Sequence, residues 1–262
     1  MSDLGMSDLG KSVSVLILAG QREGVIDPLC AAAGVDRKAI IPINGKPMID
    51  YVLDALSAGG LKTPFHVSGF DAAYDARLTQ SPSAPGPAGS AHAALTDGIS
   101  FPCLVTTCDH PLLTQDMLDI FITEAKKSGA DFCVGFAEKS VIQPAYPDVK
   151  RTYWNFSDRP VSGCNLFYIA NEKGLAVIEF WKQAQHLRKN PVKLARTVAW
   201  GLLLKYLLGR LSLTDAFGYV ARRLNITTAP ILIPIAEAAI DVDKPSDKEL
   251  VERILAGAMR DA

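Results

Sequence analysis

The sequence predicts an α/β protein: a three-layer αβα sandwich built on a mainly parallel, mixed sheet, with a helical insertion. Short apolar segments rich in β-branched residues alternate with longer amphipathic segments, which is typical of parallel strands joined by crossover helices. Clusters of Gly, Pro and Ser fall between these segments, where turns are expected. The chain has 262 residues, of which 48% are apolar, so it can bury one large core.

The elements of the first half follow in order from these patterns. Residues 13–19 are apolar, largely β-branched and closed by Gly20, which predicts a buried strand. Residues 44–47 form a turn that places Pro47 at the likeliest first position of a helix. The expected elements are a long loop over 21–37, a helix over 48–58, a strand over 65–69, a loop over 81–89, a helix that opens near Ser90, a strand over 103–107, a helix capped by Thr114 and running to 127, and a strand over 131–137.

The second half interrupts this alternation and then resumes it. Residues 142–160 are rich in Pro, Tyr, Trp and charge, and a strand follows over 161–170. Residues 174–224 predict consecutive helices, which we interpret as an insertion. Residues 231–243 return to the sheet, and Ser246 caps a last helix that runs to 258. We expect residues 1–12, which contain MSDLG twice, to be a disordered N-terminus and residues 13–262 to form a single domain.

Composition excludes several classes of protein. The formal net charge of −1 argues against a general nucleic-acid binder, which is normally basic. The five cysteines form no C-x-x-C pair, so zinc-site spacing is absent, and their odd number favours reduced thiols in the cytoplasm. No apolar run approaches the ~20 residues that a membrane-spanning helix needs.

Two of the predicted strands are followed closely by a candidate site residue. Gly20 closes the first strand and Asp109 follows the strand over 103–107. In parallel sheets, ligands bind beyond the carboxyl ends of the strands. We therefore expect Gly20 and Asp109 at the same, functional edge of the sheet.

Three segments together resemble a known family. They are Leu-Ala-Gly with the loop to Lys38, the run Cys-Asp-His-Pro-Leu-Leu-Thr around Asp109, and Asp-Val-Asp-Lys-Pro around Asp243. The chain resembles the MobA-like NTP transferases, nucleotidyltransferases with a glycosyltransferase-A-like (nucleotide-diphospho-sugar transferase-like) fold, over residues 13–170 and again from 231. The resemblance implies Mg²⁺-dependent transfer of a nucleotide from an NTP to a phosphorylated small-molecule acceptor, with release of pyrophosphate.

The resemblance also implies roles for particular residues. Asp109 and Asp243 would bind Mg²⁺, which prefers carboxylate oxygens, and Asp241 is an alternative to Asp243 if both lie on one side of a strand. Lys38 and Asp109 would be catalytic, because transfer of an anionic group needs charge stabilisation more than a base. The implied nucleotide contacts are Ala19, Gly20, Arg22, Lys38, Gly86, Gly89 and Ser90, and the implied acceptor contacts are Arg151, Gly163 and Asn165. The chain departs from the family in having Gln21 where a second glycine is usual, and a longer loop before Lys38.

Simpler interpretations of these residues remain open from sequence. Asp109 could be a turn former, and Asp243 or Ser90 a helix cap. His110 is better explained by local packing, and Lys46 by a structural or exposed role.

Basic and apolar residues are interleaved over residues 182–223. The simpler interpretation is a lid or a homodimer interface. The alternative is peripheral contact with an anionic membrane, to which such helices bind.

Two other functions compete with nucleotidyl transfer. A glycosyltransferase of the same fold would use a sugar nucleotide, but it usually carries Asp-x-Asp where this chain has Asp109-His110-Pro111. A catalytically silent nucleotide-binding protein is favoured by the altered first loop and opposed by Lys38, Asp109 and Asp243.

Overall fold

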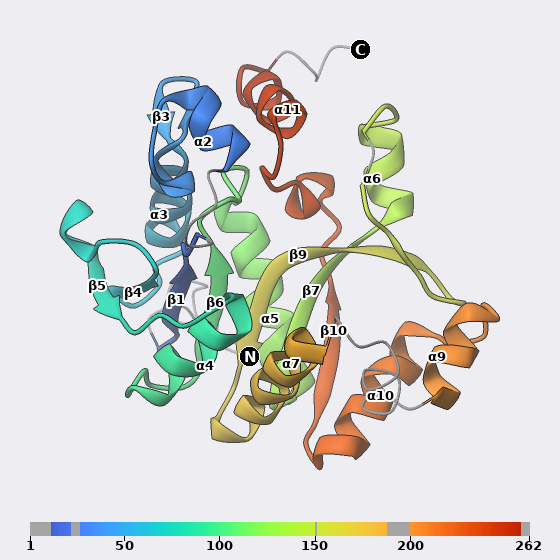
Figure 1. Ribbon diagram of the computed structural model, residues 1–262. Coiled ribbons are helices and arrows are strands. Elements are labelled where there is room, and N and C mark those ends of the chain that lie inside the picture. The colour runs from blue at the N-terminus through green and yellow to red at the C-terminus, as the bar shows by residue number, and fades with distance from the viewer. Residues whose placement is uncertain (1–11, 22–26, 150, 188–199, 258–262) are drawn as a thin grey trace, which may run out of the picture.

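The computed structural model describes residues 12–21, 27–149, 151–187 and 200–257. Within these ranges the centre of the molecule is an eight-stranded sheet, in which the strands follow the order β10-β7-β9-β6-β1-β4-β5 and β8 pairs with β9 (Figure 1). The strands are β1 (Ser14–Leu18), β4 (Phe65–Ser68), β5 (Leu78–Ser81), β6 (Cys103–Thr107), β7 (Phe132–Glu138), β8 (Trp154–Asn155), β9 (Pro160–Ile169) and β10 (Thr228–Leu232).

The sheet is mixed and mainly parallel, as predicted. Strand β1 is parallel to both β4 and β6, and the pairs β4–β5 and β7–β10 are also parallel. Strand β9 is antiparallel to β6 and β7, between which it lies. The carboxyl ends of β1 and β6 therefore meet at one edge, because Leu18 is in register with Thr107.

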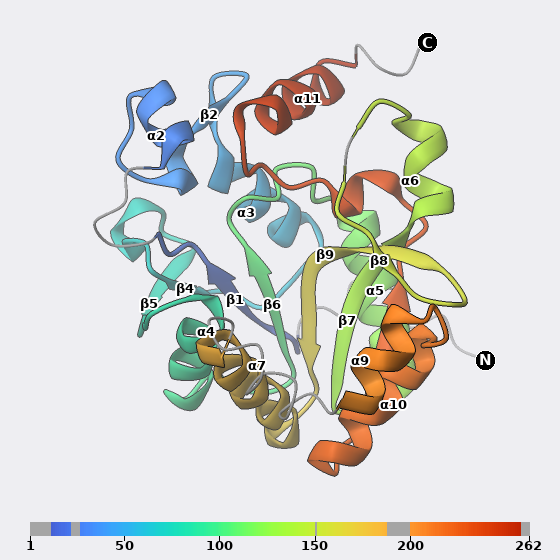
Figure 2. The same ribbon diagram turned by 45° about the vertical axis from the view of Figure 1, so that its right-hand side comes forward.

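Helices cover both faces of the sheet, which confirms the three-layer architecture (Figures 1 and 2). Strand β1 is buried throughout, and its alternating side chains divide between two cores. Val15 and Ile17 pack with α3 (Met48–Ala58) and α5 (Gln115–Ser128). Leu16 and Leu18 pack with α4 (Pro87–Thr96) and α7 (Leu175–Leu187).

Smaller elements complete the described chain. They are α2 (Pro28–Ala33), the hairpin of β2 (Pro42–Ile43) and β3 (Lys46–Pro47), α6 (Lys139–Ala145), α9 (Trp200–Leu207), α10 (Leu213–Leu224), α11 (Pro245–Leu255) and four 3₁₀ turns, η1 (Lys38–Ile40), η2 (Ala72–Tyr74), η3 (Glu172–Gly174) and η4 (Ala236–Ala239). Across the described ranges, no helix combines the length and apolar character needed to cross a bilayer. The predicted N-terminal segment lies outside the described residues except for residue 12, and the single-domain organisation stays a prediction.

Two helix starts differ from the prediction. The loop expected over 21–37 contains α2, because the Asp27 carboxylate accepts a hydrogen bond from the Leu29 N–H and Pro28 begins the helix. Helix α4 begins at Pro87 and has Gly86, with φ of 78°, as its cap. Ser90 is therefore inside the helix, where its hydroxyl donates to the Ala84 carbonyl and accepts from the Ala84 N–H.

The segment before α11 also differs from the prediction. Strand β10 ends at Leu232, and Pro234, which has no N–H to donate to a ladder, follows two residues later. Residues 241–243 thus form an extended loop and not a strand. Lys244, and not Ser246, caps α11, while the Asp247 carboxylate accepts from the backbone N–H groups of residues 243 and 244.

Candidate active site

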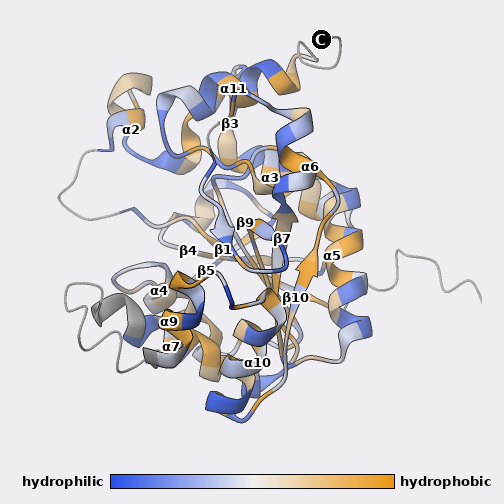
Figure 3. Ribbon diagram, turned by 90° about the vertical axis from the view of Figure 1, so that its right-hand side faces the viewer, coloured by the Kyte–Doolittle hydropathy of each residue, from blue (hydrophilic) through white to orange (hydrophobic). Residues whose placement is uncertain are grey.

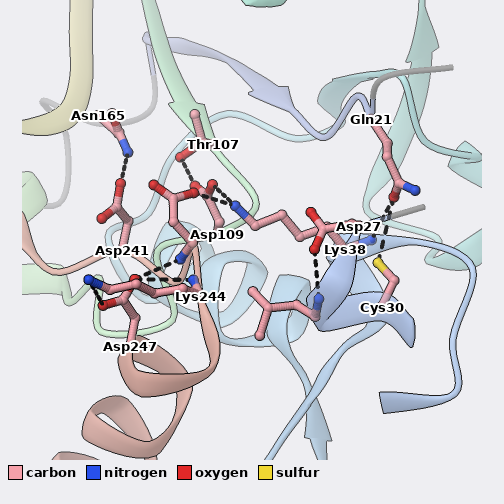
Figure 4. A network of polar contacts seen from close by, with 12 residues as sticks. Gln21, Asp27, Cys30, Lys38, Thr107, Asp109, Asn165, Asp241, Lys244 and Asp247 are labelled. Atoms are coloured by element: carbon pink, nitrogen blue, oxygen red, sulfur yellow. Dashed lines mark hydrogen bonds and ion pairs between the residues drawn. The ribbon is translucent and has the colours of Figure 1, made fainter. Parts of the chain in front are cut away.

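Three charged side chains from distant parts of the chain meet at the carboxyl edge of the sheet (Figure 4). The Lys38 ammonium, at the start of η1, donates to Asp109 Oδ2 at 2.7 Å and to Asp243 Oδ1 at 2.8 Å. Asp109 lies in the turn after β6, and Asp243 lies in the loop before α11. The two carboxylates therefore converge on one cationic position.

Hydrogen bonds hold these side chains in place. The Thr107 hydroxyl donates to Asp109 Oδ1 at 2.5 Å, which fixes one oxygen of that carboxylate while the other faces Lys38. The Val242 N–H donates to the Asp109 carbonyl at 2.9 Å, and this bond joins the Asp243 loop to the end of β6. This link is made by the backbone and adds to the side-chain contacts of the same loop.

The cluster is electrostatically unbalanced. Partial burial alone would lower the pKa of Lys38, but the ion pairs and hydrogen bonds to Asp109 and Asp243 outweigh it and raise that pKa above its ordinary value. The lysine is thus fully protonated at neutral pH. One positive charge faces two carboxylates, and the Asp243 side chain is 67% exposed, so the site can accept a further cation from solvent.

The donor set suits a Mg²⁺ ion that is shared with a ligand. Among the residues that the structure describes, no three His, Cys, Asp or Glu side chains are grouped so that they could hold a metal. Mg²⁺ does not need such a cage, since it commonly binds one or two carboxylates and completes its octahedron with water and substrate phosphates. The two converging carboxylates fit that mode of binding.

A groove of about 1270 Å³ lies beside this cluster. Gln21 and Arg37 line it, and the Lys38 backbone N–H donates to Gln21 Oε1 at 3.2 Å, which connects the groove to the charged site. Its lining also includes Gly20, Asp36, Ile40, Gly69, Phe70, Asp71, Ala73, Tyr74, Gln80, Ser83, Ala84, Pro85, Gly86 and Ser90.

The structure brings some of the expected nucleotide-site residues together and not others. Gly20, Gly86 and Ser90 line the groove. Ala19 is buried in the core and Gly89 packs against Ala84, so neither is part of the lining. Arg22 lies outside the described residues.

Two residues that shape this groove were not expected from sequence. Gln21, which replaces a usual glycine, holds the Lys38 backbone and accepts a weak hydrogen bond from the Cys30 thiol at 3.7 Å. Gly69 follows β4 with φ of +83°, and a Cβ added there would lie 2.7 Å from the Gly20 nitrogen and closer still to the Gly20 Cα. A glycine directly after a strand was the sequence signal for this close approach.

The expected acceptor-site residues divide in the same way. Asp241 forms an ion pair with Arg151 at 2.5 Å and accepts from the Asn165 amide at 3.0 Å. Asp241 thus has partners other than Lys38, and its side chain does not share a strand face with Asp243. Gly163 lies on β9 opposite Phe136, and a Cβ added there would meet no atom within 4 Å.

His110 and Lys46 have partners outside the charged cluster. His110 is buried, and its Nε2 lies 3.3 Å from the carbonyl oxygen of Glu237 on η4, so its packing is not local to its own turn as the sequence suggested. Burial lowers the pKa of His110, which favours the neutral ring. Lys46 pairs with Asp54 at 2.5 Å and lies over the Tyr51 ring.

A solved structure shares this fold. A hypothetical transferase from Thermus thermophilus is 30% identical to the chain with a TM-score of 0.77, and the match covers 90% of this chain and 99% of that one. A family model described as the MobA-like NTP transferase domain matches residues 30–157. This match to the MobA-like NTP transferase domain confirms the resemblance drawn from the sequence.

Two curated relatives support the same assignment. A probable molybdenum cofactor guanylyltransferase of Thermococcus gammatolerans is 32% identical over 115 residues, which cover 42% of this chain and 59% of that protein. A molybdenum cofactor guanylyltransferase of Vibrio atlanticus is 28% identical over 127 residues, which cover 45% of this chain and 60% of that protein. The chain thus matches somewhat under two thirds of the length of each.

Proposed function

We propose that this protein is a Mg²⁺-dependent nucleotidyltransferase that transfers a nucleotide from an NTP to a phosphorylated small molecule and releases pyrophosphate. The observation that carries the proposal is the Lys38 ammonium between Asp109 and Asp243, beside a groove with room for a nucleotide. Nucleotidyl transfer needs this combination, because anionic reactants must be brought together and their charge neutralised.

The chain's own residues would perform most of the work by binding and orientation. The NTP would lie in the groove, with its triphosphate directed along Gly20 toward Lys38. An oxygen of the acceptor phosphate forms a bond to the α-phosphorus, and the bond from that phosphorus to the oxygen bridging the β-phosphate breaks. The Lys38 ammonium would stabilise the negative charge that the departing pyrophosphate takes.

Asp109 and Asp243 would hold Mg²⁺, which when bound spreads the charge of the triphosphate. Lys38 would then turn from the carboxylates toward the phosphates, because its long side chain is flexible and its partners would be occupied. On the acceptor side, Arg151 and Asn165 are the polar groups that we expect to face the incoming phosphate. Their hydrogen bonds to Asp241 hold both side chains in place.

The names of the curated relatives guide the choice of substrates. Both are described as molybdenum cofactor guanylyltransferases, so GTP and the molybdenum cofactor form the first pair to test. The other NTPs, phosphorylated alcohols and phosphorylated sugars complete the panel.

The test is release of pyrophosphate from each NTP in the presence of Mg²⁺ and each acceptor. We expect one NTP and acceptor pair to give turnover that is lost in Asp109→Asn and kept in Asp97→Asn, a matched change of an exposed carboxylate at the end of α4. Turnover of a sugar nucleotide, with none of any NTP, would instead identify a glycosyltransferase. Nucleotide binding without turnover of any pair would identify a silent nucleotide-binding protein.

A further inference from the structure

The helix α9 exposes an unusual apolar face. Three leucines of α9 lie on that face, because they are spaced by one, three and four positions along the helix, and Leu208 directly after the helix adds a fourth; all are exposed: Leu203, Leu204, Leu207 and Leu208. Leu207 is 72% and Leu208 is 58% exposed, which is rare for neighbouring large apolar side chains. This face is not explained by the fold, since no described residue covers it.

The opposite face of α9 packs on the protein, which fixes the direction of the leucines. The Tyr206 hydroxyl accepts from the Asn155 N–H at 3.2 Å, and its ring contacts Phe156 edge to face. Strand β8 and the residue after it therefore pack against α9 through Tyr206. Trp154, the neighbouring residue on β8, is 56% exposed and extends the apolar surface.

Trp154 also lines an apolar cavity of about 400 Å³ between α7, α10 and strands β7 and β10. The other lining residues are Phe132, Val134, Val177, Phe180, Trp181, Phe217, Val220 and Thr228.

Positive charge accompanies this apolar face. Between Glu179 and Asp215 the sequence has no acidic residue and seven basic ones, of which the structure describes Lys182, Lys205 and Arg210, and Lys182 is paired with Glu179. Of these, Lys205 lies on α9 and Arg210 directly follows its end, and both are exposed. Arg222 and Arg223 add two more exposed cations at the end of α10.

We propose that the leucine face of α9, with Trp154, Lys205 and Arg210, docks on an anionic lipid bilayer. Leucines and a tryptophan would enter the headgroup region while Lys205 and Arg210 pair with lipid phosphates. The positive charge favours an anionic bilayer over a second copy of the chain as the partner of this face. A two-fold interface would bring this cationic segment against itself, with no carboxylate between residues 179 and 215 to neutralise it.

The docking surface is remote from the candidate active site, so docking does not block it. The candidate site includes Asp243, which lies in the loop before α11. Helices α2 and α11 lie at one end of the molecule, and α9 and α10 lie at the opposite end (Figure 3). Docking would therefore bring the enzyme to a membrane surface and leave the site facing away from it. This inference does not depend on the proposed reaction.

The experiment is co-sedimentation of the full chain with phosphatidylcholine vesicles that contain or lack phosphatidylglycerol, at low and at physiological ionic strength. We expect binding only to the anionic vesicles, and weaker binding at the higher ionic strength. The double variant Leu207→Ser, Leu208→Ser should abolish binding, and because both side chains are exposed it should fold normally. The variant Lys205→Gln, Arg210→Gln should weaken binding by about fivefold for each residue removed.

Matched controls use other surfaces of the chain. Leu255→Ser removes a partly exposed leucine of α11, and Lys62→Gln removes an exposed lysine before β4, and both should bind as the wild type does. Failure of the wild type to bind anionic vesicles at low ionic strength would overturn the proposal. So would light scattering that shows a dimer in the wild type and a monomer in the leucine variant, with no vesicle binding by either.

Discussion

The contact between Gly69 and Gly20 gives the sharpest test of how the groove is built. In Gly69→Ala, the new methyl group would enter the Gly20 backbone, where 2.7 Å separates it from the nitrogen. Alanine at φ of +83° costs about 1–2 kcal/mol, and overpacking against backbone costs about 1–3 kcal/mol more. The lower entropy of the unfolded alanine chain offsets roughly 0.4–1 kcal/mol. Taking the middle of each range, the free energy of unfolding should thus fall by about 3 kcal/mol.

Two other glycines separate the contributions. Gly98 has φ of +98° and no atom within 4 Å of its added Cβ, so Gly98→Ala measures the backbone conformation alone and should cost about 1 kcal/mol. Gly20→Ala would place its methyl group 3.9 Å from the Gly69 Cα, an ordinary contact, and should leave stability nearly unchanged.

Urea denaturation and calorimetric measurement of NTP binding together test whether the approach of Gly69 to Gly20 restricts position 69. Gly69→Ala should also weaken NTP binding by about tenfold or more, because displacing Gly20 costs at least one hydrogen bond to a charged phosphate. If Gly69→Ala is as stable as Gly98→Ala, the close approach does not restrict this position and the reasoning is wrong. If Gly20→Ala keeps full stability but loses NTP binding, the nucleotide itself approaches Gly20.

Three further predictions concern the charged site and the response to pH. Asp109→Asn and Asp243→Asn should each lower kcat by about 10²-fold or more without unfolding the chain, as measured by pyrophosphate release and thermal melting; normal Mg²⁺-dependent turnover would refute the assignment. Lys38→Ala should lower kcat more than it raises the acceptor KM, and a change in the acceptor KM alone would move Lys38 to the acceptor site. Burial, with the nearby Lys62 charge, lowers the pKa of His66 below its ordinary value of about 6.5, so its contribution to stability is present above that pH and is lost as the pH falls through the folded pKa. Urea midpoints should therefore fall less steeply with acid in His66→Gln than in the wild type, and equal slopes would show that another group controls the loss.

The sequence by itself determined most of the architecture. Alternating apolar segments predicted β1, β4, β6, β7 and β9, and Thr114 is the cap of α5 as expected. These signals are local, because a strand's period and a helix cap involve residues only a few positions apart. The signal that placed Asp109 at a strand end was also local, because the apolar strand directly precedes it. The family resemblance likewise rested on short segments.

The tertiary structure decided which of these residues meet. Lys38 contacts Asp109 across 71 positions of the chain and Asp243 across 205, and no periodic pattern encodes such a contact. The same holds for Asp241, which the sequence offered as a metal ligand and the fold pairs with Arg151 and Asn165. A single backbone bond, from the Val242 N–H to the Asp109 carbonyl, brings the Asp243 loop to β6. Val242 and Asp109 become neighbours only after the sheet has assembled. For that physical reason, the geometry of the site could not be predicted from the sequence.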